Sequence, residues 1–362
     1  MKRWTVLHES GAPSHYRGLE VALNAGAHSS GVSFLEFHIL RQFAKGLVSR
    51  NYSAVVRAGK NAAALARLLI SGGAGENIVI GMAPFNPRVI WIRIICRNAT
   101  VLMHSSWPYW DLSFQPHPWR FRFVLRSWES FCKKRVKHVF FVTRFAERNF
   151  NESSFAGPST SVVAHAYDQV AFYCDPRRES QRLRFVFVGR LEKSKGLFHV
   201  LALAERFPEC SFAVIGDGPL LPELKKAEQR YGNISVCGQV GNRRDLGDLL
   251  RNSDVLLLPS IRIPGWEELF GMAIIEAMAC GVVPVTTDHR GPTEILSGTG
   301  VGLVCSEGDF LEQASAFINI LAGNRDVLEH QRRLAVATAR DYELSSIANR
   351  WLAGVAEVAH EK

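Results

Sequence analysis

Short β-rich runs alternate with longer stretches of helical periodicity along the whole chain. The clearest run is Val255-Leu256-Leu257-Leu258, an unbroken apolar segment that is typical of a parallel strand buried on both faces. When strands and helices alternate, the strands form parallel sheets joined by right-handed crossovers. The pattern therefore predicts an α/β protein built from doubly wound parallel sheets.

The expected elements follow one another in a regular order. In the first half we expect strands at Trp4–His8, Val32–Leu40, Ala54–Arg57, Asn77–Met82, Thr100–His104, His138–Val142 and Ser161–Ala166. In the second half we expect strands at Arg184–Gly189, Ser211–Gly216, Ile234–Gly238, Val255–Leu258, Val283–Thr286 and Gly302–Val304. Helices are expected between them, for instance at Lys60–Ile70, Pro87–Arg97, Gly196–Phe207, Pro222–Tyr231, Leu246–Asn252 and Met272–Ala279.

The length of 362 residues is typical of two domains. The polar, proline-containing segment 174–183 indicates a linker, so we expect an N-terminal domain over residues 1–173 and a C-terminal domain over residues 184–340. Residues 341–362 are expected to hold a last helix with one apolar face, which could pack on either domain, including back on the first. Two such sheets imply a cleft, and ligands bind beyond the carboxyl ends of the strands.

The positive charge is concentrated in the first half of the chain. Residues 1–175 contain 21 Lys and Arg against 10 Asp and Glu, a net charge of +11, whereas the remainder holds 22 against 24, a net charge of −2. This asymmetry favours an anionic partner for the first half: a membrane surface, a phosphorylated acceptor or nucleic acid. Nucleic acid is disfavoured, because the basic residues are not interleaved with a known recognition module.

The cysteines and the apolar segments restrict the compartment. The seven cysteines are odd in number and form no Cys-x-x-Cys pair, which argues against a disulfide framework and a zinc site. Small core residues in a reducing compartment, the cytoplasm, are expected instead. The N-terminal apolar stretch is too short for a signal peptide, and no window reaches about 18 apolar residues. Any membrane contact is therefore expected to be peripheral.

Two cations follow the first expected strand of the second half. That strand ends at Gly189, Arg190 comes next, and Lys195 lies five residues further on, at a helix start. Two cations at the carboxyl end of a strand can hold a diphosphate. Taken alone, such a segment is more often a solvated basic loop.

The next expected strand runs into Gly216-Asp217-Gly218-Pro219. Proline is favourable at a helix start, and Gly218 would let a ligand approach the backbone. The third glycine of the dinucleotide-binding fingerprint is missing, which weakens a dehydrogenase interpretation. By itself, the segment is also compatible with a simple strand-to-helix turn.

The most specific segment contains two glutamates, Glu268 and Glu276, eight residues apart. That spacing is slightly over two helical turns, so both carboxylates can face one direction. Glu268 precedes the helix start, where free backbone N–H groups attract phosphate. Glu276 lies in an otherwise apolar helix and is costly to bury without a partner, for which ribose hydroxyls are suitable. The alternative is a capping glutamate together with a core hydrogen bond.

Together, these segments resemble glycosyltransferase family 4, which has the GT-B fold of two Rossmann-like domains facing each other across a cleft. The resemblance covers the second half in order, with Gly-Arg-Leu and Lys-Gly, Gly-Asp-Gly-Pro, Pro-Ser, and Glu-x7-Glu with Phe-Gly and Glu-Ala-Met-Ala-Cys-Gly. In the first half, Ala164–Asp168 is similar to the stretch that precedes the family's linker, with His165 in place of an asparagine. The loop at residues 10–16 lacks the family's Gly-Gly pair.

The resemblance implies a role for each matching residue. Arg190 and Lys195 hold the donor diphosphate. Glu276 binds the ribose hydroxyls, Glu268 contacts the donor sugar, and His104 faces that sugar across the cleft. The other implied donor contacts are the loop residues Gly11, Gly189, Gly216 and Gly218, the segment Gln239-Val240 near the base, and the backbone amides of Phe270, Gly271 and Met272.

The implied reaction is a retaining transfer of a hexose from a UDP- or GDP-linked sugar to a hydroxyl of a cell-surface glycan or lipid-linked acceptor, as in lipopolysaccharide, O-antigen or exopolysaccharide biosynthesis. The acceptor attacks on the face from which the nucleotide leaves, so stabilising the leaving group is the main task, at about 3–4 kcal/mol for a preorganised group. No Asp-x-Asp pair occurs, so no metal and no other cofactor is expected.

Two alternatives share this fold. A sugar-nucleotide epimerase would bind a similar donor but would need additional acid/base groups and no acceptor. The second alternative is a non-catalytic scaffold bound to a membrane or a complex. It is disfavoured by the complete set of expected donor-site residues: Arg190, Lys195, Glu268 and Glu276.

Residues 118–137 predict an amphipathic helix in the basic half. Its apolar face consists of side chains at helical spacing: Phe121, Val124, Leu125, Trp128, Phe131 and Cys132. Its basic face includes Arg122, Arg126, Lys133 and Lys134. Such a helix is either packed in the core with a solvated basic face or docked on anionic lipid, with Trp119 and Phe123 among the headgroups.

Overall fold

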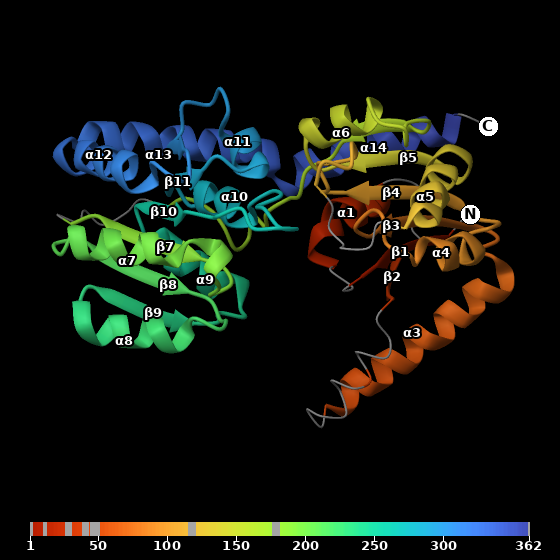
Figure 1. Cartoon of the computed structure of the whole chain (residues 1–362), viewed down its shortest axis with the longest axis horizontal. Helices are drawn as coiled ribbons and strands as arrows, with labels where there is room; N and C mark the ends of the chain where they lie inside the picture. The colour runs from red at the N-terminus through yellow and green to blue at the C-terminus, as the bar shows by residue number, and fades with distance from the viewer. Residues whose placement is uncertain are drawn as a thin grey trace. The chain divides into compact units, whose positions relative to one another are not determined.

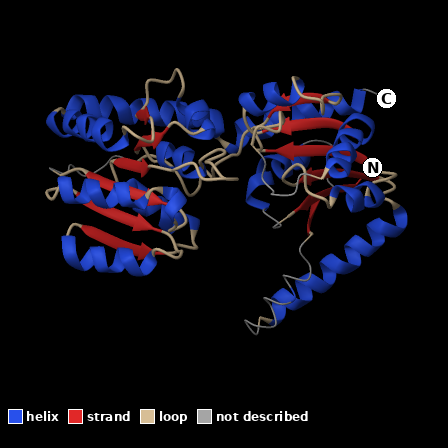
Figure 2. Cartoon of the chain, viewed as in Figure 1, coloured by secondary structure: helices blue, strands red, loops and turns tan. Residues whose placement is uncertain are grey.

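The computed structural model of the chain describes residues 3–9, 13–25, 31–37, 43, 51–114, 121–175 and 182–360. Contacts divide the chain into two compact units, Met1–His165 with Ile347–Lys362, and Ala166–Ser346. Each unit contains a six-stranded parallel sheet with helices packed against it (Figures 1 and 2). The predicted class of two doubly wound α/β domains is confirmed, although the first unit ends at His165, before the expected boundary at residue 173.

The sheet of the first unit has the strand order β2-β1-β3-β4-β5-β6, and every neighbouring pair is parallel. Its strands are β1 Arg3–His8, β2 Val32–Glu36, β3 Glu76–Gly81, β4 Thr100–Ser105, β5 Val136–Phe141 and β6 Ser159–Val162. The strand order reverses between β1 and β3, and ligands of such sheets bind beside the carboxyl ends at this switch point. Here those ends are His8 and Gly81.

The sheet of the second unit has the order β12-β11-β10-β7-β8-β9, again with parallel neighbours. Its strands are β7 Arg184–Val188, β8 Ser211–Ile215, β9 Ile234–Gly238, β10 Val255–Leu258, β11 Val283–Thr287 and β12 Leu303–Cys305. Read from β9, this is the strand order of the dinucleotide-binding fold, with the switch point between β7 and β10. The topology therefore brings together the loops that follow these two strands.

Helices connect the strands in both units. In the first unit they are η1 Pro13–Tyr16, α1 Arg17–Ala25, α3 Tyr52–Ser71, α4 Val89–Ile95, α5 Arg122–Arg135 and α6 Arg144–Asn151. In the second unit they are η2 Lys193–Lys195, α7 Leu197–Arg206, α8 Leu221–Tyr231, α9 Arg243–Arg251, α10 Met272–Ala279, α11 Arg290–Leu296, α12 Phe310–Gly323, α13 Arg325–Ala339 and η3 Arg340–Tyr342. The last helix, α14 Leu344–His360, belongs to the first unit from Ile347 onward.

One predicted strand is wrong. The two adjacent valines of Ala54–Arg57 favour an extended segment, but these residues lie in the first turns of α3. The side chain of Asn51 caps this helix by accepting a hydrogen bond from the backbone N–H of Ala54 at 3.1 Å, and Gly72 ends it in the left-handed conformation. These end signals and the apolar periodicity across the helix outweigh the weak strand propensity of two valines.

The amphipathic helix of the basic half forms as α5, and most of its apolar face is packed in the core. Trp128 donates a hydrogen bond from Nε1 to the carbonyl of Asn86 at 2.9 Å, and Phe123 remains exposed. The side chains with no or almost no exposed surface are Val124, Trp128, Phe131 and Cys132. Of the two alternatives for this helix, core packing holds for these four side chains, whereas Phe121 of the same expected face is 46% exposed. Trp119 lies outside the described residues.

The last helix packs on the sheet of the first unit. The Trp351 side chain is fully buried, with its ring centroid 4.3 Å from Phe140 and 5.1 Å from His104. A Cβ on Gly18 of α1 would lie 2.8 Å from Ile347 and 3.0 Å from Trp351, so α1 and α14 pack closely. The tertiary structure thus decides where this helix docks, which its apolar face alone left open.

The core of the second unit lies on the sheet face covered by α7 and α12. Phe185 of β7 and Phe212 of β8 stack with ring centroids 4.7 Å apart, and Phe310 of α12 is fully buried in the same cluster. The cysteines behave as predicted small core residues in most cases. All seven are free thiols, and the buried ones are Cys96, Cys132, Cys210, Cys280 and Cys305.

Candidate functional site

The loops that follow β7 and β10 meet at the switch point of the second sheet. Gly189 and Arg190 follow β7, and the backbone N–H of Ile261, after β10, donates to the carbonyl of Ser194 at 2.8 Å. At Gly196, which has φ +64°, a Cβ would overlap the carbonyl oxygen of Pro259. Only glycine permits this approach, because any side chain would separate the two loops. The predicted site residues Arg190 and Lys195 are therefore held against the loop that carries Glu268.

Lys195 and Glu268 form an ion pair, although they are 73 residues apart in the sequence. Both side chains are largely buried, with 11% and 15% of their surface exposed. The Lys195 ammonium also lies 4.7 Å from the ring centroid of Trp266, and the Ser260 hydroxyl lies 3.4 Å from the Glu268 carboxylate. A cation in this setting is preorganised and weakly solvated, which strengthens its interaction with an anion that enters the site.

Arg190 is placed differently from Lys195. Its side chain is 65% exposed and contacts the Glu192 carboxylate at 2.9 Å. An exposed ion pair of this kind contributes little to stability. The guanidinium is therefore free to change partner at small cost when an anionic ligand binds.

Glu276 has a protein partner that the sequence analysis missed. Its carboxylate is almost fully buried and forms an ion pair with Arg243, the first residue of α9, whose guanidinium lies 4.7 Å from the ring centroid of Phe172. Burial raises the pKa of Glu276, and the Arg243 charge opposes that shift. The cost of a buried carboxylate was the available signal; it implies a nearby partner but does not say where that partner lies in the sequence. The paired glutamates Glu268 and Glu276 thus contact different cations.

The glycines after β8 have a structural reason that does not depend on a ligand. A Cβ on Gly216 would overlap the carbonyl oxygen of Gly189, and one on Gly218 would lie 2.6 Å from the carbonyl oxygen of Leu191. The loop after β8 therefore packs directly on the loop that carries Arg190. The backbone N–H of Gly216 also donates to the carbonyl of Gly238 at 2.9 Å, which aligns the ends of β8 and β9.

The remaining predicted donor contacts lie at the same edge of the second sheet. Gln239 is exposed and Val240 half-buried directly after β9. Gly271, with φ +94°, caps α10, so the backbone amides of Phe270, Gly271 and Met272 lie at the amino end of that helix. Such an end has unpaired N–H groups and attracts negative charge.

The first-unit residue assigned to the site, His104, is buried in a cluster of aromatic rings and histidines. Its Nε2 donates to the carbonyl of Val163 at 3.3 Å, and its ring centroid lies 5.2 Å from Tyr16 and 5.5 Å from His165. Burial lowers the pKa of His104 to about 3, with the Val163 hydrogen bond opposing the shift, so the ring is neutral at pH 7. Gly11, the other predicted first-unit contact, lies outside the described residues.

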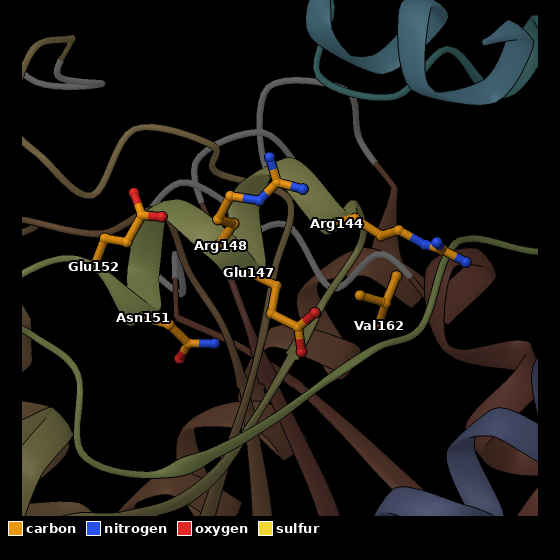
Figure 3. A pocket seen from close by; sticks show the side chains of 6 residues that line it. All are labelled: Arg144, Glu147, Arg148, Asn151, Glu152 and Val162. Carbon is orange, nitrogen blue, oxygen red and sulfur yellow. The ribbon is translucent and has the colours of Figure 1, made fainter. Parts of the chain in front are cut away.

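A pocket of about 520 Å³ lies on the first unit beside α6, and none of its lining residues is a predicted site residue (Figure 3). Its lining consists of polar side chains and one valine: Arg144, Glu147, Arg148, Asn151, Glu152 and Val162. Two arginines and two glutamates compensate each other, so the lining does not favour an anion.

Comparison with known proteins identifies the second unit. Residues 175–340 match the family described as Glycosyl transferases group 1, and this range contains Arg190, Lys195, Glu268 and Glu276. Residues 175–340 are a group 1 glycosyltransferase domain. The family and its named relatives place this domain among transferase enzymes.

The relatives of this glycosyltransferase domain share its sequence over part of their length. The gpi3 protein of phosphatidylinositol N-acetylglucosaminyltransferase from Schizosaccharomyces pombe is 27% identical over 175 residues, 46% of this chain and 37% of the relative. The putative colanic acid biosynthesis glycosyltransferase WcaL from Salmonella typhimurium is 30% identical over 182 residues, 48% of this chain and 44% of the relative. The chain thus spans less than half the length of these relatives.

The whole chain resembles a solved structure, Alr3699/HepE from Anabaena in complex with UDP. The TM-score is 0.71 at 17% sequence identity, over 99% of this chain and 100% of that chain. At this identity the similarity shows the fold alone. Together with the two six-stranded sheets, it assigns the GT-B fold to the chain.

Proposed function

We propose that the chain is a retaining glycosyltransferase of family 4 that moves a hexose from a UDP- or GDP-linked donor to a hydroxyl of a cell-surface glycan or lipid-linked acceptor. The observation that carries this proposal is the buried Lys195–Glu268 pair at the switch point of a group 1 glycosyltransferase domain. The relatives support the acceptor class, since their names refer to phosphatidylinositol and to colanic acid biosynthesis. UDP in the Anabaena structure supports the donor class.

In this proposal the site works mainly on the leaving group. As the glycosidic bond stretches, negative charge grows on the β-phosphate, and Arg190 and Lys195 stabilise it without a divalent metal. The acceptor hydroxyl attacks on the same face, so the anomeric configuration is retained. Glu268 binds the sugar hydroxyls, Glu276 binds the ribose, and the amides before α10 bind phosphate or sugar oxygens.

A panel of UDP- and GDP-sugars tests the proposal. Thermal shift of the purified chain selects the donor, and turnover of that donor is then measured with and without acceptor glycans and with and without EDTA. Transfer that needs an acceptor and survives EDTA supports a metal-independent transferase. Isomerisation of the donor without acceptor would identify an epimerase, and no binding to any donor would favour a scaffold.

Replacing Glu276 and Glu268 separately is expected to affect different parts of the donor. Glu276→Ala should lower the affinity for the free nucleoside diphosphate about 10-fold, because it removes charge-assisted hydrogen bonds to the ribose. Glu268→Ala should leave that affinity nearly unchanged and lower only the affinity for the intact nucleotide sugar. Isothermal titration with both ligands measures the difference.

Arg243→Ala is the control for this pair, since it removes the partner of Glu276 but keeps the carboxylate. If Glu276 acts only by holding Arg243, then Arg243→Ala and Glu276→Ala will lose nucleotide affinity equally. Equal losses in Glu268→Ala and Glu276→Ala would contradict the assigned division of roles.

We further propose that the chain works in the cytoplasm, bound peripherally to an anionic membrane through its first unit. In the described part of the chain, no helix has both the length and the apolar composition needed to cross a bilayer. The α4 helix exposes Ile90, Trp91 and Ile94, with Trp91 63% exposed. It lies beside α5, since Arg93 contacts Ser127 at 3.3 Å. Together with Phe121 and Phe123 at the start of α5, which are 46% and 58% exposed, these side chains are available to lipid, whereas the buried face of α5 is not.

Co-sedimentation with liposomes tests this surface. The wild type should sediment with anionic vesicles and less so as salt rises, because each basic residue near the surface contributes about 1 kcal/mol. Binding should drop when four exposed cations of α5 are replaced by serine, namely Arg122, Arg126, Lys133 and Lys134. It should also drop in Trp91→Ala.

The matched control removes four exposed cations from the second unit, Lys193, Lys226, Arg230 and Arg333. It should sediment like the wild type, because its charges lie outside the proposed surface. Wild-type protein that stays in the supernatant at low salt would refute the membrane proposal and leave a soluble anionic acceptor as the partner of the basic half.

A further inference from the structure

The peptide of Glu268 is held from both sides by the residues that begin α11. Its N–H donates to Nδ1 of His289 at 2.9 Å, and its carbonyl accepts from the N–H of Gly291 at 3.3 Å. A Cβ on Gly291 would overlap the backbone of Phe270, so the two segments are in direct backbone contact. The direction of the Glu268 side chain is therefore set partly by a segment more than twenty residues further along the chain.

His289 can accept this hydrogen bond only as a neutral ring. Its side chain has no exposed surface, and burial, together with the nearby Arg262 charge, lowers its pKa. Because Nδ1 accepts from the Glu268 N–H, the ring proton must lie on Nε2, which faces the Glu307 carboxylate at 3.4 Å. Nε2 makes no hydrogen bond of regular geometry within the described residues, so the carboxylate favours this tautomer through its charge alone.

The other end of the same loop is held by Arg262. Its guanidinium contacts the carboxylates of Asp288 at 3.0 Å, Glu307 at 2.9 Å and Glu267 at 3.4 Å. The Glu267 side chain is almost fully buried. The loop from Arg262 to Glu268 is therefore fastened at both ends to residues 288–307, and His289 is the contact nearest to the predicted sugar-binding carboxylate.

We propose that His289 is a positioning residue, which fixes the Glu268 peptide so that the Glu268 carboxylate meets both Lys195 and the donor sugar. This inference rests on the proposed function, because it assigns Glu268 to the sugar. His289 does not touch the donor in this proposal. It acts through one backbone hydrogen bond, and its loss leaves the N–H of a half-buried residue without that acceptor.

Two substitutions of His289 separate positioning from packing. His289→Leu fills the site without an acceptor, whereas His289→Asn places a carbonyl oxygen near the position of Nδ1. In His289→Leu, the affinity for the intact nucleotide sugar should fall about tenfold, with the free nucleoside diphosphate unaffected. His289→Asn should restore most of the lost affinity. Isothermal titration with both ligands measures the split.

Hydrogen–deuterium exchange gives a readout that needs no donor. The peptide that contains Glu268 should exchange about tenfold faster in His289→Leu, and His289→Asn should restore its protection. His138→Leu is the matched control, because it removes a buried histidine of the first unit, one that hydrogen-bonds Ser159 and Ser161. It should leave both the exchange of this peptide and the ligand affinities unchanged.

The inference is overturned if His289→Leu keeps the wild-type affinity for the nucleotide sugar, or if His289→Asn binds that ligand no more tightly than His289→Leu. It is also overturned if His289→Leu loses affinity equally for the nucleotide sugar and for the free nucleoside diphosphate. Failure of the proposed function looks different, since the wild type itself would bind no nucleotide sugar of the panel. In that case the exchange data alone decide whether His289 holds the Glu268 peptide, and unchanged exchange in His289→Leu refutes it.

Discussion

Replacing Lys195 with alanine is expected to lower turnover of the nucleotide-sugar donor by about 100-fold, with the domain still folded. The ammonium is buried beside Glu268 and Trp266, so it meets the leaving diphosphate with little competition from water. Arg190→Ala should also lower turnover strongly, for a different reason: its exposed guanidinium can leave Glu192 at small cost and pair with the leaving diphosphate. Initial rates at saturating donor and acceptor measure the loss of turnover, and circular dichroism of each variant checks that it is folded.

The chain offers a close control for this prediction. Lys193 lies in the same short helix, η2, but is exposed. Lys193→Ala should therefore keep near-normal rates. Because Lys195→Ala also removes the partner of Glu268, a double-mutant cycle with Glu268→Ala separates the lost cation from the unpaired carboxylate. If Lys195→Ala and Arg190→Ala both retain near-normal rates, the assignment of these residues to the diphosphate is wrong.

Replacing Trp351 with alanine is expected to cost about 3–5 kcal/mol in the free energy of unfolding of the first unit, because it empties a fully buried site among aromatic rings. The α14 helix should then detach more readily, since Trp351 and Ile347 form its contact with α1. Urea unfolding followed by circular dichroism measures the shift in the unfolding midpoint of the first unit. A separate transition of the second unit should keep its midpoint.

Trp91→Ala is the matched control, because the same side chain is removed from a position that is 63% exposed. It should change the free energy of unfolding by no more than about 0.5 kcal/mol. Identical midpoints for the two variants would mean that α14 is not docked on the first unit in solution. Limited proteolysis within α14 gives an independent reading of the same contact.

Much of the fold could be predicted because its signals are local. The apolar run at β10 and the glycines that end β7 and β8 identify parallel strands and their carboxyl ends without any tertiary information. The failure at Ala54–Arg57 has the same origin, since two valines favour a strand locally, whereas the whole of α3, with its caps, favours a helix. In short segments, local propensity is a weak guide.

The sequence predicted which residues belong to the candidate site, but it did not predict which of them contact one another. The positions after β7 and β10 indicated Arg190, Lys195 and Glu268. These residues come close together only because β7 and β10 are neighbours in the sheet, which is a property of the strand order. Arg243 and His289 were missed because each acts on a glutamate from a distant element. A buried carboxylate or N–H requires a partner, but the requirement does not specify which residue supplies it.

The sequence by itself therefore determined the α/β class and the positions of most strands, because periodicity and turn residues act over a few positions. The residues that it assigns to the chemistry remain a prediction. The tertiary structure alone decided which strands are neighbours, that α14 returns to the first unit, and that the apolar face of α5 is in the core. An amphipathic pattern reports that a face is buried but not against what, since protein and lipid both exclude water. That choice is made by the packing of whole layers.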